Sequence, residues 1–257
     1  MLSTRSRAVA RTGARVLAND PGPIIAMLAL PLLLTAFLKP AMAAQLHAAG
    51  FAGATGAEQL VPGMAVMFAF LTNQITCTLF YREHYWGTWE RLRASGARAS
   101  ELMLGKAIPL FAVILGQVLT LFAVGALVFG YRITGSLLAL VVLLVGLVAC
   151  VIAFGLMVVA LVRTLDQAMM LGSLVGMLMA GLGGALAPVS SMPGWAQAVA
   201  HVTPTYWGLR GINDVTFAGA GLGDVVVPLA VLLGFAAVCA VVAAARFNPT
   251  ETKIGTT

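Results

Sequence analysis

Six long apolar runs constrain what this chain can fold into. A run of about 20 apolar residues is long enough to cross the hydrocarbon core of a bilayer as a helix. The chain has 257 residues, of which 60% are hydrophobic and only 9% charged, whereas soluble domains carry about 25% charged residues. A water-soluble fold is therefore excluded. We expect an all-α membrane protein in which residues 1–257 form a single domain with six transmembrane helices. The expected spans are residues 23–42, 60–81, 104–129, 136–162, 168–187 and 225–245.

Basic residues are distributed unevenly among the segments between these runs. Most of them lie in residues 1–20, in residues 82–106, at Arg163 and after residue 245. Only three lie elsewhere: Lys39, Arg132 and Arg210. Lys and Arg favour cytoplasmic loops, and an even number of spans places both termini on one side. We therefore expect both termini in the cytoplasm.

Residues 1–20 precede the first span and have a helical pattern of charge. Arg7, Arg11 and Arg15 follow one another at four-residue spacing, which places them on one helical face. This pattern favours a short helix at the inner membrane surface, and a disordered basic tail is the alternative. The first apolar run is longer than the apolar core of a signal peptide, so we expect it to be retained as a span.

One long, charge-dense stretch, residues 82–100, interrupts the apolar runs, and we call it the elbow. Trp86, Trp89 and Leu92 stand there beside several Glu and Arg residues. Such a helix can pack on a soluble partner while its charges determine the register; the alternative is a solvated loop. The candidate partner-contact residues are Arg82, Glu83, Gly87, Thr88, Glu90, Arg91 and Arg93.

Two of the spans carry unusual side chains. The second contains a polar cluster made up of Thr72, Asn73, Gln74, Thr76 and Thr78. Amides are costly in hydrocarbon unless they are paired, so these groups are expected either to join helices or to line a wet cavity. The fifth span repeats small residues every four positions, which allows close approach of another helix from the same chain or a second copy. This stripe comprises Gly172, Gly176, Ala180 and Gly184.

Residues 188–224 differ from the spans because they mix prolines, aromatic residues and short amphipathic pieces. Trp195, Tyr206 and Trp207 suit the boundary between membrane and water. We expect two short helices here, on the outer face, that re-enter the bilayer without crossing it.

Several kinds of chemistry have no sequence signature in this chain. The phosphate-binding loop G-x-x-x-x-G-K-[ST] is missing, since Gly105-Lys106 is followed by Ala107. Catalytic and metal-binding motifs such as HExxH and GxSxG are missing as well. We therefore expect neither an enzyme nor a metal site, and no cofactor in this chain. We read the net charge of +6 as a membrane-topology signal, not as a sign of nucleic-acid binding.

Two motifs carry a resemblance to a known family. The stretch REHYWGTWERLRASGARASELMLGK begins at Arg82, and APVSSMPGWAQAVAHVTPTYWGLRG begins at Ala187. In this order the chain resembles the permease subunits of ABC transporters of the ABC-2 type, such as the daunorubicin-resistance, nodulation-factor and polysaccharide exporters. It departs from their pattern by the insertion of Tyr85-Trp86 and by Thr203 where many relatives have Asn.

The resemblance implies half of an exporter in the bacterial plasma (inner) membrane. Two permease copies, identical or paired with a related chain, would bind a separate ATPase dimer through the elbow, which would be the coupling helix. ATP and Mg²⁺ would bind to that partner. The cargo would be a drug, lipid or glycolipid; the alternatives are a polysaccharide-lipid or haem-precursor permease and an ATP-independent membrane scaffold. The candidate cargo residues are Phe70, Asn73, Gln74 and Met177, for which a packing role is the alternative.

Overall fold

The computed structural model describes residues 4–19, 21–48, 50, 53–87, 89 and 99–247. Within these ranges every regular element is a helix. The helices are α1 (Thr4–Asn19), α2 (Gly22–Ala48), α3 (Ala57–Leu71), α4 (Asn73–Tyr85), α6 (Ala99–Val128), α7 (Leu137–Leu161), α8 (Leu165–Leu182), η1 (Val189–Ser191), α9 (Gly194–Ala200), α10 (Pro204–Phe217) and α11 (Val226–Arg246).

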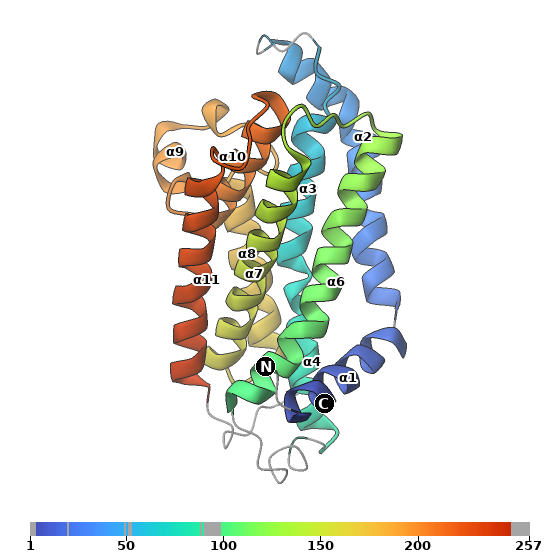
Figure 1. Cartoon of the computed structure of the whole chain (residues 1–257), viewed down its shortest axis with the longest axis vertical. Coiled ribbons are helices and arrows are strands. Elements are labelled where there is room, and N and C mark those ends of the chain that lie inside the picture. The colour runs from blue at the N-terminus through green and yellow to red at the C-terminus, as the bar shows by residue number, and fades with distance from the viewer. Residues whose placement is uncertain are drawn as a thin grey trace.

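Six of the described helical segments are long and apolar enough to cross a membrane, which confirms the predicted six-span, all-helical fold. They are α2, the combined α3 and α4, α6, α7, α8 and α11. Figure 1 shows them side by side, with α1 across one end together with the end of α4 and the start of α6. We call this the elbow end. The opposite end, which carries α9 and α10, is the cap end.

The second and fourth spans form the centre of the bundle. Their apolar windows are 83% and 67% buried, against 11% for α2 and 22% for α8 and for α11. The outer helices expose large apolar side chains such as Phe37 and Leu127. Lipid is as apolar as these side chains, so their exposure carries no penalty in a bilayer.

Very close helix contacts surround the central span. A Cβ on Gly63 of α3 would collide with the carbonyl oxygen of Ala185, and one on Gly125 of α6 would lie 2.8 Å from Val61. Small residues at these positions let the backbones approach, which is how helices without a hydrophobic driving force gain packing energy.

The second span is divided into two helices at Thr72. Helix α3 ends at Leu71 and α4 begins at Asn73. The Thr72 hydroxyl lies 2.7 Å from the carbonyl oxygen of Phe68, one turn earlier, and 2.7 Å from Oε1 of Gln117. Threonine hydroxyls that bond back to the preceding turn often bend helices. The apolar run that the sequence presents as continuous is thus interrupted at its polar cluster.

At the cap end, the turn between α6 and α7 is joined to α10. The Tyr131 hydroxyl lies 2.6 Å from Oγ1 of Thr216, and the backbone N–H of Gly135 donates to Val215 at 2.9 Å. Burial raises the pKa of the Tyr131 phenol to about 12, so it remains neutral at ordinary pH. These bonds fix α10 against the spans; whether α9 and α10 re-enter a bilayer stays a prediction.

Helix α1 has the two faces that its sequence predicts. Arg7, Arg11 and Arg15 are exposed, whereas Val9 and Leu17 are buried. The buried face lies against α6. A helix rather than a disordered tail therefore precedes the first span, and its position at a membrane surface stays a prediction.

Candidate functional site

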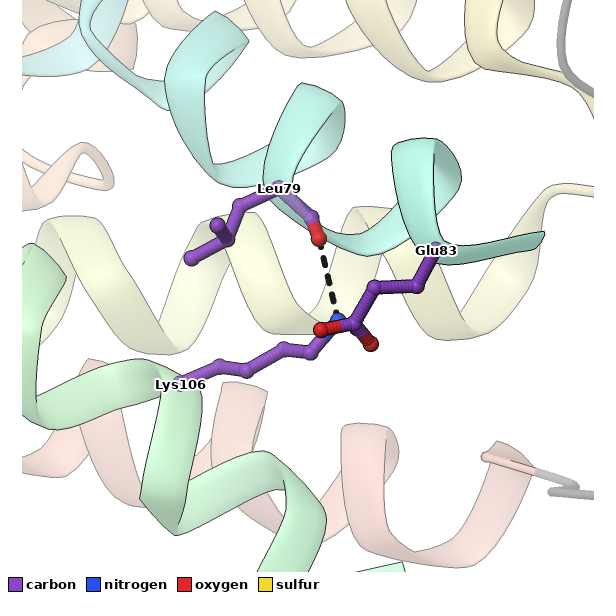
Figure 2. A network of polar contacts seen from close by, with 3 residues as sticks. All are labelled: Leu79, Glu83 and Lys106. Atoms are coloured by element: carbon purple, nitrogen blue, oxygen red, sulfur yellow. Dashed lines mark hydrogen bonds and ion pairs between the residues drawn. The ribbon is translucent and has the colours of Figure 1, made fainter. Parts of the chain in front are cut away.

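A buried ion pair connects the elbow end of α4 to α6. The ammonium of Lys106 lies 2.5 Å from Oε2 of Glu83, and it donates a hydrogen bond to the carbonyl oxygen of Leu79 at 3.0 Å (Figure 2). Lys106 is only 1% exposed, and Glu83 is 17% exposed. A buried ammonium is tolerated only when anionic and carbonyl oxygens replace its water. The pair therefore fixes the last turns of α4 to the beginning of α6.

Aromatic rings complete the surroundings of this ammonium. Lys106 Nζ lies 4.2 Å from the ring centre of Phe80 and 5.6 Å from that of Trp89. Both rings in turn make edge contacts with Phe247, which follows α11. We call this group, Phe80, Glu83, Trp89, Lys106 and Phe247, the Lys106 cluster. It brings α4, the elbow, α6 and the end of α11 together at one point.

The predicted elbow residues are only partly described. The Arg82 guanidinium lies 4.3 Å from the ring centre of Trp86. Gly87 has φ +67°, in the left-handed region that favours glycine, which accounts for glycine at this turn. Four further predicted contact residues lie outside the described residues: Thr88, Glu90, Arg91 and Arg93.

Three members of the Lys106 cluster are not among the functional candidates that the sequence predicts: Phe80, Lys106 and Phe247. A signal exists for Lys106, because it lies inside the predicted span 104–129 and an ionisable residue within a span normally has a specific partner. Phe247 has no such signal: it is an ordinary aromatic residue near the end of a span.

The polar cluster of the second span joins neighbouring helices. Gln117 of α6 lies within hydrogen-bonding distance of Thr72 and also donates to the carbonyl oxygen of Met27 in α2 at 3.1 Å. Gln74 donates to the hydroxyl of Ser173 in α8 at 2.7 Å. These bonds favour the helix-joining role over a cavity lining for most of the cluster.

Two atoms of this polar cluster have no hydrogen-bond partner among the residues that the structure describes. Oδ1 of Asn73 and Oγ1 of Thr76 are buried without one, although the Asn73 amide nitrogen donates to Val151 at 3.3 Å. The Asn73 oxygen lies against Gly155 of α7, where a Cβ would collide with it. Unsatisfied polar atoms are rare in folded proteins, and here both lie in the first turn of α4, after the helix break.

An apolar pocket of about 230 Å³ lies in the elbow half of the bundle. It is bounded by α1, the start of α2, α4 and the start of α8. Most of its lining is aliphatic, with Gln74, Thr78 and Arg82 as the polar members. A smaller pocket of about 190 Å³ lies at the cap end, between α3, the end of α8 and α10.

The four predicted cargo residues do not converge on one surface. Phe70 is buried and its ring centre lies 5.7 Å from that of Phe154. Asn73 is buried too, whereas Gln74 lines the apolar pocket. Met177 is 54% exposed on the outer face of α8. Within a single copy, only Gln74 reaches a cavity.

The small-residue stripe faces the same chain, because Gly172, Gly176 and Ala180 are all buried within it. A Cβ on Gly176 would lie 3.0 Å from Cβ of Phe70 in α3, while one on Gly172 would meet no atom within 4 Å. Ala180 is fully buried. Gly184 lies beyond the end of α8 with φ +99°, and its carbonyl oxygen accepts a bond from Gln59.

Nothing in the described ranges provides a metal site. No three His, Cys, Asp or Glu side chains there are grouped to bind an ion. Cys77, Cys150 and Cys239 are buried free thiols.

Comparisons with known proteins bear on this arrangement. Linearmycin resistance permease protein LnrN of Bacillus subtilis is 26% identical over 186 residues, which cover 68% of this chain and 46% of that protein. Probable multidrug ABC transporter permease YbhR of Escherichia coli is 29% identical over 159 residues, which cover 61% and 42%. ABC transporter G family member 20 of Dictyostelium discoideum is 26% identical over 164 residues, which cover 63% and 22%.

The matched regions make up less than half of each of these relatives. No solved structure matches the chain. The sequence model described as ABC-2 type transporter matches residues 9–217, which include α2 to α10 and the elbow. Six spans, a charged elbow between the second and third, and this match together show that the chain belongs to the ABC-2 type transporter family.

Proposed function

We propose that this chain is the permease subunit of an ATP-binding-cassette exporter, driven by a separate ATPase dimer that binds the elbow. One observation carries the proposal: the buried pair of Lys106 and Glu83 links the base of the elbow to α6. The chain has no phosphate-binding loop, so ATP and Mg²⁺ would bind to the partner. The energy for transport must then enter through a protein surface.

The geometry of the pair suits such a role. An elbow attached only by flexible chain would move without displacing the spans. Here α4 and α6 are joined by a 2.5 Å ion pair whose ammonium is buried. Separating the two charges would leave each poorly solvated, which costs several kcal/mol. Movement of the elbow would therefore displace α4 and α6 together.

The apolar pocket beside α4 supports a hydrophobic or amphipathic cargo such as a drug, lipid or glycolipid. Its wall is mainly aliphatic, with an amide, a hydroxyl and a guanidinium at Gln74, Thr78 and Arg82. Apolar pockets with few polar groups are typical of small-molecule sites. The names of two relatives, linearmycin resistance permease and probable multidrug permease, agree with this class of cargo.

A second permease copy, or a related chain, would complete the path through a bacterial inner membrane, with both termini in the cytoplasm. The exposed face of α8 supports this part of the proposal. Met170, Leu174 and Met177 are more than half exposed there, and the helix also borders the apolar pocket through Met169. The remaining outer surface would contact lipid.

Co-expression with an ATP-binding-cassette ATPase, if one is encoded beside the permease gene, tests the proposal. The ATPase should co-purify, and its ATP hydrolysis should change when the permease is present. Glu90→Arg in the elbow should abolish both effects. Arg132→Glu, an exposed charge reversal at the cap end, is the matched control and should abolish neither. An ATPase that neither binds nor responds would instead favour the membrane scaffold.

Export assays with the same complex distinguish the cargo classes. Inside-out vesicles that contain the permease and its ATPase should accumulate a hydrophobic drug or a labelled lipid when ATP is added. Accumulation only of a polysaccharide-linked lipid or a haem precursor would replace the cargo part of the proposal and leave the ATPase part intact.

A further inference from the structure

Phe247 occupies a position that the proposed ATPase contact alone does not explain. It follows α11 directly, and its N–H still donates to the carbonyl oxygen of Ala243 at 2.8 Å. Its side chain is only 7% exposed although it lies at the very end of a span. The family match ends at residue 217, so this aromatic residue lies outside the matched region.

The Phe247 ring touches the two rings that face the Lys106 ammonium. Its centre lies 6.2 Å from that of Phe80 and 6.1 Å from that of Trp89, with planes inclined at 78° and 84°. Near-perpendicular rings at this separation are a favourable aromatic geometry. Phe247 therefore packs against the two aromatic rings that face the Lys106 ammonium.

The contacts of Phe247 connect α11 to the elbow. Helix α11 packs mainly along α7, and also against α10. Trp89 is an elbow residue and is 4% exposed. Through Phe247, the last span is thus attached to the same point at which α4 and α6 meet.

We propose that Phe247 is a positioning residue that couples α11 to the elbow, so that elbow movement displaces the last span as well as α6. The inference rests on the proposed function, in which the elbow receives the ATPase. Phe247 acts through Trp89 and Phe80, and it need not contact the ATPase.

The experiment compares Phe247→Ala, Phe247→Leu and Phe247→Tyr in the full chain, reconstituted with its ATPase. ATP hydrolysis is measured with and without the permease, and the amount of co-purified ATPase is measured separately. Val241→Ala, on an exposed position of α11, is the matched control. The Leu variant fills the space without a ring, and the Tyr variant keeps the ring.

We expect Phe247→Ala and Phe247→Leu to lower permease-stimulated hydrolysis by about twofold to tenfold, the range of one or two aromatic contacts. Co-purification should change by less than about twofold, and Phe247→Tyr should restore stimulation. Trp89→Leu and Phe247→Leu remove one shared ring contact, so together they should lower stimulation by less than the product of their separate effects. Wild-type stimulation in the Leu variant would overturn the inference, as would effects of the two substitutions that multiply.

Two further results separate this inference from the proposed function. If the ATPase neither co-purifies with the wild-type permease nor responds to it, the proposed function fails. Glu83→Gln and Lys106→Met are the reference variants for coupling through the Lys106 cluster. If those variants lower stimulation and Phe247→Leu does not, only the role of Phe247 is wrong. Should the Ala variant fail to accumulate, the Leu and Tyr variants decide the question.

Discussion

At the residue scale, burying the charges of Lys106 and Glu83 costs much solvation free energy, which their close pairing offsets. Removing one partner leaves the other charge poorly solvated, whereas removing both leaves neither charge to be paired. We therefore expect Lys106→Met to destabilise the protein by about 3 kcal/mol. The double variant Glu83→Gln/Lys106→Met should recover most of that loss. Thermal unfolding in detergent measures both.

Lys106→Arg is the control for charge alone in this prediction. It keeps the cation but replaces a compact ammonium by a planar guanidinium in a closely packed site. We expect its melting temperature to lie between those of Lys106→Met and the wild type. Equal melting temperatures for Lys106→Met and the wild type would show that the pair contributes nothing to the fold.

Two glycines provide a second prediction at this scale. Gly63→Ala places a methyl group against the carbonyl oxygen of Ala185, a backbone atom that cannot move away alone. Gly172→Ala places one where no atom lies within 4 Å. We expect the first substitution to lower the free energy of unfolding by about 1–3 kcal/mol, as overpacking does, and the second to be tolerated. Comparable melting temperatures would contradict this close contact.

The residue scale also shows where sequence reasoning succeeds and fails. Gly176 belongs to a small-residue stripe whose period predicts close packing, and it does lie against Phe70. The same spacing includes Gly172, which is also buried, although a Cβ there would meet no described atom within 4 Å. Periodicity identifies a helical face, but it does not identify the partner. The partner depends on how α8 is placed against α3, which is a tertiary property.

At the element scale, the break at Thr72 lies where a hydrogen bond joins the second span to α6. Thr72→Val or Gln117→Leu removes the hydrogen bond that joins α4 and α3 to α6. Each should lower stability by about 0.5–1.5 kcal/mol, Gln117→Leu the more because it also loses the bond to Met27. The double variant should cost little more than Gln117→Leu alone. Thr120→Val is the control, because that hydroxyl bonds only within α6. Fully additive effects would show that the two side chains do not interact.

The helical elements were predictable to different degrees. Apolar runs of membrane length predicted six spans, since few other folds hide so much apolar surface. The division of the second run was not predicted, although Thr72 and Asn73 are poor helix formers. The direction of the Thr72 hydroxyl depends on Gln117, 45 residues away, so local sequence could not reveal it.

At the scale of the whole molecule, the exposed face of α8 is expected to meet a second copy. Met177 is 54% exposed on this face, whereas Leu127 is 86% exposed on α6. We expect Met177→Cys to form a copper-catalysed cross-link between copies in membranes, and Leu127→Cys to form little. Efficient cross-linking of Leu127→Cys but not of Met177→Cys would show that the two copies meet at α6 and not at α8. The native cysteines are buried, which keeps the background low.

The role of the Lys106–Glu83 pair is tested by measuring ATP hydrolysis by the reconstituted permease and ATPase across a double-mutant cycle of Glu83→Gln and Lys106→Met. If the pair transmits elbow movement, each single variant should lower permease-stimulated hydrolysis by about tenfold, and the double variant should be no worse than either. If the amount of co-purified ATPase is unchanged, the loss of stimulation reflects lost transmission of elbow movement and not lost binding of the ATPase. Stimulation that stays at the wild-type level in all three variants would show that the pair does not transmit elbow movement.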